Sequence, residues 1–190
     1  MVRQYDSSRR RKAAEQTRQD ILQAALKLHW EGITGFEPLA REAGCSLATL
    51  RKYFPTKELL FQNCTRAFAE TLTMPDLEAL GAISGQSQRL EQSVSALCRM
   101  HEAMFGYAWL GAHQRDESPT LHAEMSAYEG LADAISDIIT PAGSAKAPLI
   151  RGLLDFLTYR ALRLAGQLSP EQASTELIAT LHPLIVAGTD

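Results

Sequence analysis

Residues 36–57 read FEPLAREAGCSLATLRKYFPTK, and this stretch decides the fold of the chain. Apolar side chains recur at helical spacing over residues 36–43, and Gly44 is placed to end that helix in a left-handed cap. Ser46 carries a side chain suited to capping a second helix, which is predicted to run to Phe54 because a proline follows. Two short helices joined by a turn of about three residues form a helix-turn-helix.

The same spacing sorts the side chains of the second helix, Ser46–Phe54. Leu50 and Phe54 are expected to point inward. The outward positions are then Leu47, Ala48, Arg51 and Lys52, with Thr49 at the margin. In a helix-turn-helix this second helix enters the major groove of DNA, where arginine can bond guanine and an apolar side chain can contact a thymine methyl group. We expect Arg51 to take the first role, and Leu47 or Ala48 the second.

Groups suited to phosphate surround this helix. They are Lys52, Lys57, the hydroxyl of Thr56 and the free backbone amides that open the next helix at Thr56. Near the start of the chain the run Arg9, Arg10, Arg11 and Lys12 predicts a flexible basic arm over residues 1–14, which would add phosphate or minor-groove contacts.

The charge of the chain is divided along its length. Residues 1–66 hold 12 Lys and Arg against seven Asp and Glu, whereas residues 67–190 hold seven against 15. The formal charge is therefore +5 in the first part and −8 in the second. A basic tail beside an ordinary acidic bundle would give the same numbers, and helix-turn-helix patterns also occur in proteins that never bind DNA. Pattern and charge together favour a DNA-binding module.

Several other classes of protein are disfavoured. No window approaches the roughly 18 apolar residues of a membrane-spanning helix, and the polar N-terminus does not resemble a signal peptide. Cys45, Cys64 and Cys98 have spacings that suit neither a disulfide framework nor a zinc site, which predicts a reducing, cytoplasmic location. Residues 67–190 carry no G-x-S-x-G, H-E-x-x-H, P-loop or dinucleotide motif, so we expect no enzyme.

The chain has 190 residues, and 45% of them are apolar. Beyond the helix-turn-helix the apolar residues continue to recur at helical spacing. Ser118-Pro119 is predicted to open a helix, residues 141–148 to form a loop, and residues 149–168 to form a helix. Ser169 and Gln172 are spaced as a capping box ahead of a final helix over residues 172–187. The chain is thus expected to be all-α, with about eight or nine helices. Its expected parts are a three-helix DNA-binding domain over residues 15–62 and a helical ligand-binding and dimerisation domain over residues 63–190.

Three segments in their order and spacing resemble the N-terminal DNA-binding domain of the TetR family of transcriptional regulators. They are ILQAA at 21–25, LAREAGCS at 39–46 and TLRKYFPTKELL at 49–60, so the resemblance covers about residues 17–62, a third of the chain. It implies a homodimer that binds a palindromic operator, usually as a repressor. It also implies a helical C-terminal domain that binds a small effector and whose last two helices form a four-helix dimer interface.

The family's base- and phosphate-contacting positions fall on Leu47, Ala48, Thr49, Arg51, Tyr53 and Lys57. Two departures concern side chains directly. Arg51 stands where the family usually has a tyrosine, and His29 stands where an aromatic residue usually follows Leu28.

A small-molecule effector would need a pocket in the second part of the chain. Aromatic and methionine side chains suit an adaptable apolar pocket, although most such residues in a bundle are plain core. The candidates are Met100, Met104, Phe105, Tyr107, Trp109, His113, Met125, Tyr128, Phe156 and Tyr159. His101, His113 and His122 lack metal-ligand spacing, so neither a metal nor a cofactor is expected.

The end of the chain is the expected dimer interface. The final helix has a long apolar stripe, and the preceding one contains the small residues Gly152, Ala161 and Gly166, which permit close approach. The interface candidates are Leu153, Leu157, Ala161, Leu177, Leu181, Leu184 and Ile185. Packing within the chain's own bundle is the alternative. Two other functions stay open: a helical dimeric ligand-binding or scaffold protein with no regulated DNA binding, and a helical enzyme or carrier with a vestigial motif.

Overall fold

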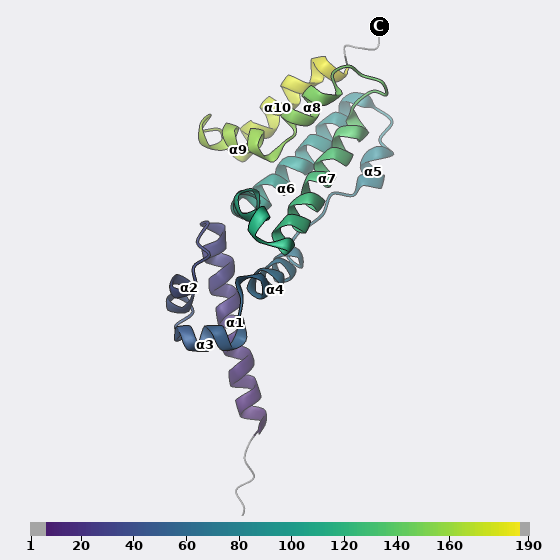
Figure 1. Cartoon of the computed structure of the whole chain (residues 1–190). Helices are drawn as coiled ribbons and strands as arrows, with labels where there is room; N and C mark the ends of the chain where they lie inside the picture. Colours follow the sequence, from purple (N-terminus) through teal and green to yellow (C-terminus); the bar gives the residue numbers. More distant parts are fainter. Residues whose placement is uncertain (1–6, 187–190) are drawn as a thin grey trace, which may run out of the picture. The chain divides into compact units, whose positions relative to one another are not determined.

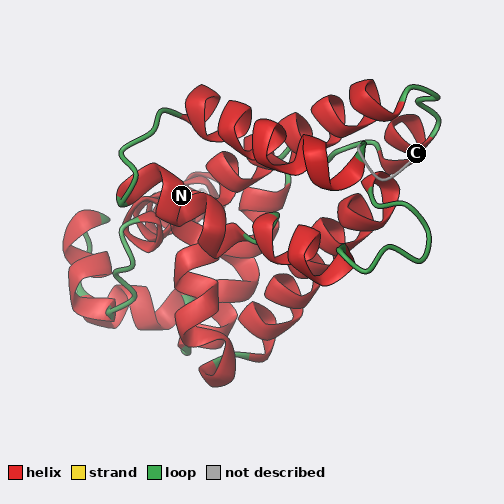
Figure 2. Cartoon of the chain, turned by 90° about the horizontal axis from the view of Figure 1, so that it is seen from above, coloured by secondary structure: helices red, strands yellow, loops and turns green. Residues whose placement is uncertain are grey.

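The computed structural model describes residues 7–186, and this range is helical with no strand in it (Figure 2). The all-α class is confirmed. The described helices are α1 (Ser7–Trp30), α2 (Phe36–Glu42), α3 (Leu47–Tyr53), α4 (Lys57–Ala69), α5 (Leu77–Gly81), α6 (Gln86–Gln114), a 3-10 helix (Arg115–Glu117), α7 (Pro119–Ile139), α8 (Ala147–Leu153), α9 (Phe156–Leu164) and α10 (Pro170–Ile185). None of them combines the length and the apolar character needed to cross a membrane.

The chain divides into two units. The first comprises the chain up to Thr71 together with Trp109–His122, and the second comprises Leu72–Ala108 and the chain from Ala123 onward. The expected boundary after residue 62 falls inside α4, where a continuous helix runs to Ala69. The sequence pattern could not place residues 109–122 with the first unit, because that assignment depends on contacts between distant parts of the chain.

The core of the first unit is formed by the helices of the helix-turn-helix and their two neighbours. In it α1 packs against α2 and α4, while α2 packs against α3 (Figure 1). The buried side chains that meet there are Ile21, Leu22, Ala25, Leu28, Leu39, Ala40, Leu50, Phe54, Leu60 and Cys64. Burial of this apolar area, at about 25 cal/mol for each Å², is the main favourable term holding α3 in place.

The start of α1 corrects the prediction of a flexible arm. Residues 7–14 are helical, whereas residues 1–6 of the expected arm lie outside the described range. Arg, Lys and Ala are strong helix formers, and this outweighs the low apolar content of the segment. Side-chain hydrogen bonds one turn apart, from Gln19 to Glu15 and from Gln16 to Asp20, both 2.8 Å, support the helix just beyond it.

At its other end, α1 stops where a glycine reverses the chain. Gly32 has φ +80°, and its amide bonds the carbonyl of His29 at 2.9 Å. The His29 side chain is buried, and its ring centroid lies 5.2 Å from that of Phe61. Its Nε2 has no hydrogen-bond partner among the described residues. Burial, with a smaller effect of the positive charge of Lys57, lowers the pKa of His29 to about 4, so the ring is neutral at pH 7.

A second set of contacts attaches the end of α6 and the start of α7 to α4, all inside the first unit. Phe61 forms a small apolar cluster with Leu110 and Leu121. Beside it, the Glu58 carboxylate accepts hydrogen bonds from the Ser118 hydroxyl (2.6 Å) and from the backbone amide (3.0 Å) and hydroxyl (2.5 Å) of Thr120. The bonds from Ser118 and then Thr120 hold the pKa of Glu58 below its usual value. The Ser118 hydroxyl also caps Leu121, as its sequence position predicts.

In the second unit, His101 of α6 is held by two other elements. Its Nε2 donates to the backbone carbonyl of Leu154 at 2.9 Å, which leaves Nδ1 to accept from the Tyr128 hydroxyl. Burial lowers the pKa of His101 to about 4. A neutral imidazole thereby satisfies a carbonyl at the junction between α8 and α9 and a hydroxyl on α7.

That junction corrects the prediction of a single helix over residues 149–168. The structure has two helices, with Leu154 and Asp155 between them. The Asp155 carboxylate accepts a hydrogen bond from the Leu157 amide at 2.7 Å and so caps α9. The predicted capping box ahead of α10 is confirmed: the Gln172 amide donates to the Ser169 hydroxyl, and the Ser169 amide donates to the Gln172 side chain.

We expect His29→Phe to stabilise the protein. At pH 7 the variant should gain about 1 kcal/mol, because it removes a buried nitrogen that has no hydrogen-bond partner. As the pH falls from 6.5 to about 4, the gain should increase by about another 3 kcal/mol. Over this range the histidine of the unfolded parent binds a proton, whereas the buried histidine of the folded parent does not. Urea unfolding at several pH values, followed by helix content, measures the difference between parent and variant.

The matched control for this experiment is Gln23→Phe, at an exposed position of the same helix. It should leave the pH dependence of stability as it is in the parent, because glutamine does not titrate. A constant difference between parent and His29→Phe from pH 7 to pH 4.5 would contradict the role given to His29.

Candidate nucleic-acid interface

The turn between α2 and α3 has the geometry that its sequence predicts. Gly44 has φ +64°, a left-handed conformation that residues with a Cβ adopt at a cost. The next amide, of Cys45, bonds back to the Ala40 carbonyl at 2.9 Å. The Ser46 hydroxyl accepts from the Thr49 amide at 3.1 Å and so caps α3. This short turn fixes the direction in which α3 leaves α2.

Burial then decides which side of α3 meets solvent. Leu50 is 0% exposed and Phe54 is 1% exposed, and both belong to the core of the first unit. Ser46, Ala48, Arg51 and Lys52 are exposed, while Leu47, Thr49 and Tyr53 are half-buried. The spacing therefore predicted the inward positions Leu50 and Phe54 and the outward positions Ala48, Arg51 and Lys52, whereas Leu47, expected outward, is half-buried. That these side chains contact DNA stays a prediction.

Cations lie at the C-terminal end of this exposed face. Lys52 also approaches the ring of Tyr53, with its Nζ 5.9 Å from the ring centroid. Lys57 is exposed at the start of α4, and the Thr56 hydroxyl before it accepts from the Leu59 amide at 3.2 Å. Because that bond uses the oxygen as an acceptor, the hydroxyl hydrogen can still donate to a phosphate. Arg9, Arg10 and Arg11 lie exposed on the first turns of α1, not on a flexible arm.

Thiol and metal chemistry has little support in the described residues. No group of three or more His, Cys, Asp or Glu side chains within residues 7–186 is placed to hold a metal ion. Burial raises the pKa of Cys64 to about 12 and that of Cys98 to about 11. Cys45 is half-buried, and burial raises its pKa as well.

The ten residues expected to line an effector pocket do not form one site. Trp109 and His113 belong to the first unit, where the His113 Nδ1 donates to the Trp109 carbonyl at 2.9 Å. The other eight lie in the second unit: Met100, Met125, Tyr128, Phe156 and Tyr159 are buried, and Met104, Phe105 and Tyr107 are half-buried. Phe156 lies 5.9 Å from both the His101 and the Phe105 rings, centroid to centroid. These aromatic residues pack against one another, as expected if they belong to the core of the bundle and do not line a pocket.

The second unit instead has a polar groove that the sequence analysis missed. Its volume is about 650 Å³, and it lies between α6, α9 and α10. The walls are Ser95, Cys98, Arg99, Glu102, Ala103, Tyr159, Pro170, Glu171 and Ser174. Of the ten predicted residues, Tyr159 alone is among them. The polar positions 95, 99 and 102 do recur at helical spacing, but a solvated helix face has the same pattern.

An ion pair forms one wall of this groove. The Glu102 carboxylate accepts from the Tyr159 hydroxyl at 2.7 Å and from Arg163 Nε and Nη2 at 2.9 Å and 3.1 Å. The Arg163 guanidinium holds the pKa of Glu102 below its usual value. A second groove of about 560 Å³, between α5 and α6, shares Ser95 and Arg99 with the first.

The candidate dimer residues separate into two groups. Leu177, Leu181 and Ile185 of α10 are at most 4% exposed within the single chain, so the expectation that they form the dimer interface is wrong. Their apolar stripe packs into the chain's own core. Leu157 is 52% exposed and Ala161 is exposed, while Leu153 and Leu184 are half-buried. Leu149 and Leu164, 49% and 51% exposed, add to this second group.

Comparisons with known proteins give structural matches. No protein-family model matches the sequence, and no curated protein matches it. A solved HlyIIR mutant protein, with a segment substituted by a linker containing two thrombin sites, matches at 18% identity with a TM-score of 0.58. The match covers 87% of this chain and 97% of that one. A transcriptional regulator from Rhodococcus sp. Rha1 matches at 20% identity with a TM-score of 0.56, over 92% of this chain and 96% of that one.

A TetR transcriptional regulator from Rhodococcus sp. RHA1 matches at 18% identity with a TM-score of 0.41, over 92% of this chain and 99% of that one. The first two matches cover most of this chain, 87% and 92% of it, and therefore include parts of both units. The chain has the TetR-like fold of these two solved structures.

Proposed function

We propose that this chain is a sequence-specific DNA-binding transcriptional regulator that works as a homodimer. The observation that carries the proposal is the exposed face of α3, with Ala48, Arg51 and Lys52 outward above the buried Leu50 and Phe54. A seven-residue helix with this face, held at a fixed angle to α2, fits the major groove. The guanidinium of Arg51 can bond guanine O6 and N7, and the Ala48 methyl group can contact a thymine methyl group.

Phosphate contacts would come from the neighbouring cations and amides. Lys52 and Lys57 are exposed on either side of the α3–α4 turn, and the first turn of α4 offers free amides. Such contacts set the register of the protein on the duplex without reading its sequence. If a dimer makes about 6–10 of them, affinity should fall by three to five decades between 50 and 200 mM salt.

The exposed apolar stripe of α9 supports the homodimer. Leu157, Ala161 and Leu164 are spaced at four and three residues, so they lie on one side of the helix and are exposed together. A two-fold contact through this side would present two α3 helices to two half-sites, with centres about one helical turn of 34–36 Å apart or a multiple of it.

More specifically, we propose that the protein is a repressor and that a small-molecule effector releases it from its operator. The polar groove between α6, α9 and α10 supports it as a place for an effector. To change operator occupancy, the effector must bind the DNA-free state more tightly by a few kcal/mol. The walls combine charged side chains with apolar surface from Ala103, Tyr159 and Pro170, so they suit a molecule with both polar and apolar parts.

Selection of bound duplexes from a random library, at two salt concentrations, tests the proposal. The purified full-length protein should enrich an inverted repeat, and the spacing of its halves should give the separation of the two α3 helices. No enrichment above background at either salt concentration would contradict sequence-specific binding and favour the scaffold or carrier alternatives.

Arg51→Ala should weaken binding to the selected operator by about 1–3 kcal/mol and relax the preference at one guanine position of each half-site. The side chain is exposed, so the fold should be unaffected. Fluorescence anisotropy with the operator and with single-base variants measures both effects.

Arg151→Ala is the matched control for Arg51→Ala. It removes the same charge from an exposed ion pair with Asp133 in the second unit, so it should leave operator preference unchanged. Unchanged preference in Arg51→Ala itself would disprove the base-reading role.

Leu157→Glu should convert the dimer to a monomer, because it places a charge on the exposed α9 stripe at a large apolar side chain. Sedimentation equilibrium measures the mass. Met74→Glu, at a side chain that is 60% exposed and lies outside the stripe, should remain dimeric. A dimer that persists in Leu157→Glu would place the interface elsewhere.

A further inference from the structure

Two grooves of the second unit meet on α6. The polar groove between α6, α9 and α10 and the groove between α5 and α6 share Ser95 and Arg99 in their walls. Along α6, the groove beside α5 is lined from residue 91 to residue 99, and the polar groove from residue 95 to residue 103. At 1.5 Å for each residue, the two together extend about 18 Å along the helix axis. They adjoin as one elongated site with Arg99 near its middle.

Arg99 places a positive charge where the two grooves meet. Its side chain is exposed, and it forms no ion pair with a carboxylate within residues 7–186. Ser95, one turn earlier on the same helix, adds a hydroxyl to both grooves. A guanidinium can bind a carboxylate through two parallel hydrogen bonds. The junction of the grooves is therefore suited to the carboxylate of a ligand.

Glu171 places a negative charge on the opposite wall of the polar groove. It lies exposed in the first turn of α10 and accepts a hydrogen bond from the Ser169 hydroxyl at 2.8 Å. The bond from its own backbone amide, and then the bond from Ser169, hold the pKa of Glu171 below its usual value, so the side chain is charged at pH 7. This end of the site is suited to a cationic group.

Glu102 adds a second acceptor at the same end. Arg163 compensates its charge, but Oε1 accepts a single hydrogen bond among the described residues, from Arg163 Nη2 at 3.1 Å. A carboxylate oxygen can accept two hydrogen bonds, so Oε1 has room for one more donor. Glu102 and Glu171 together offer an ammonium group two acceptors from two helices.

The groove beside α5 offers an apolar surface. Its walls include Met74, which is 60% exposed, together with Pro75 and Leu80. Apart from Arg99, the charged side chains in its walls are Asp76 and Glu91, and both are acidic. They would repel a second carboxylate, so this groove suits the uncharged part of a ligand.

These three features together describe one class of molecule. An α-amino acid with an apolar side chain carries a carboxylate, an ammonium group and an apolar group on a single carbon. The N-terminus of a peptide has no carboxylate beside its ammonium group, and a fatty acid has no ammonium group. Each of these alternatives would leave one of the charged positions without a partner.

We propose that the two grooves bind a free α-amino acid with a large apolar side chain. Its carboxylate bonds Arg99, and its ammonium group lies between Glu102 and Glu171. Its side chain covers the apolar surface around Met74. The inference rests on the proposed function, because it names the chemical class of the effector. A molecule so small in an open site should bind with a dissociation constant of about 1 mM.

The first test removes one group of the ligand at a time. Ligand-observed NMR titrations use the purified full-length protein without DNA. The probes are L-phenylalanine, 3-phenylpropanoate, which lacks the ammonium group, 2-phenylethylamine, which lacks the carboxylate, and L-alanine, which lacks the ring. L-phenylalanine should bind most tightly, and each of the other three should bind about fivefold more weakly or less.

The second test assigns each charged group of the ligand to its partner. Arg99→Gln should bind L-phenylalanine about fivefold more weakly and should bind 2-phenylethylamine as the parent does, because that probe has no carboxylate to lose. Glu171→Gln should likewise weaken L-phenylalanine and leave 3-phenylpropanoate unaffected.

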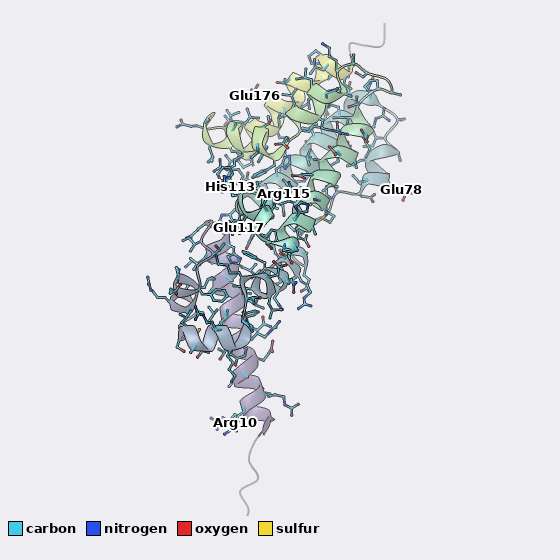
Figure 3. The ribbon with its side chains drawn as sticks, viewed as in Figure 1. Arg10, Glu78, His113, Arg115, Glu117 and Glu176 are labelled. Carbon is cyan, nitrogen blue, oxygen red and sulfur yellow. The ribbon has the colours of Figure 1, made fainter. Side chains whose placement is uncertain are left out.

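Two exposed positions outside both grooves give matched controls. Arg151→Gln on α8 is the control for Arg99→Gln, and Glu176→Gln, also on α10, is the control for Glu171→Gln (Figure 3). Both control variants should bind all four probes as the parent does.

Several outcomes would overturn the inference. They are equal affinity of the parent for L-phenylalanine and 2-phenylethylamine, parent-like binding of L-phenylalanine by Arg99→Gln, and no saturation at about ten times the expected dissociation constant. Each of them would leave the α3 interface intact.

A separate titration of the selected operator complex with L-phenylalanine tests the effector role. Operator occupancy should fall as the amino acid is added. Binding of the amino acid with unchanged occupancy would keep the ligand class and overturn its role as effector. A parent that binds no specific DNA sequence would overturn the proposed function, and the binding measurements made without DNA would still decide the ligand class.

Discussion

Burial of Leu50 and Phe54 is the constraint on which the proposed interface depends. The seven-residue helix α3 has little freedom once Leu50 within it and Phe54 directly after it are fixed in a core, because the rotation of the remaining positions is set by the helical repeat. Ala48, Arg51 and Lys52 must then face solvent whatever their own chemistry. The core of the first unit thus determines which side of α3 faces solvent. The chemistry of the exposed residues then determines only which partner that side can bind.

Local features of the fold could be predicted, because their causes lie within a few residues. The hydroxyls of Ser46, Thr56 and Ser169 cap the helices that follow them, and Gly44 takes the left-handed conformation that the turn requires. Each of these depends on a backbone amide no more than three residues away or on one backbone angle. Short-range pattern reasoning therefore located the helix-turn-helix and the face of α3.

Features that depend on distant contacts could not be predicted in the same way. The break after α8 exposes a carbonyl at Leu154 that His101, far earlier in the chain, satisfies. The apolar stripe of α10 suits a dimer or a core equally well, and the structure places Leu181 in the core. The polar groove uses side chains from three helices, and its residues on α6 have the pattern of any solvated surface. Helical periodicity identifies a face but not the element that covers it.

Glu58 connects α4 to the start of α7 within the first unit through hydrogen bonds. Its carboxylate satisfies two hydroxyls and one backbone amide at the start of α7, and it does so from the first turn of α4, directly after the reading helix. These charge-assisted bonds attach the start of α7 to the first turn of α4, a helix whose Leu60 and Cys64 are fixed in the core of the first unit.

The burial of two cysteines has a practical consequence. Cys64 and Cys98 are 4% exposed, and their raised pKa values keep them as unreactive thiols, whereas Cys45 is half-buried. A thiol-directed fluorophore or spin label should therefore attach first to Cys45, one residue before the cap of α3. The natural sequence thus offers a reporter position beside the reading helix, without an engineered cysteine, from which the arrival of a nucleic acid could be observed directly.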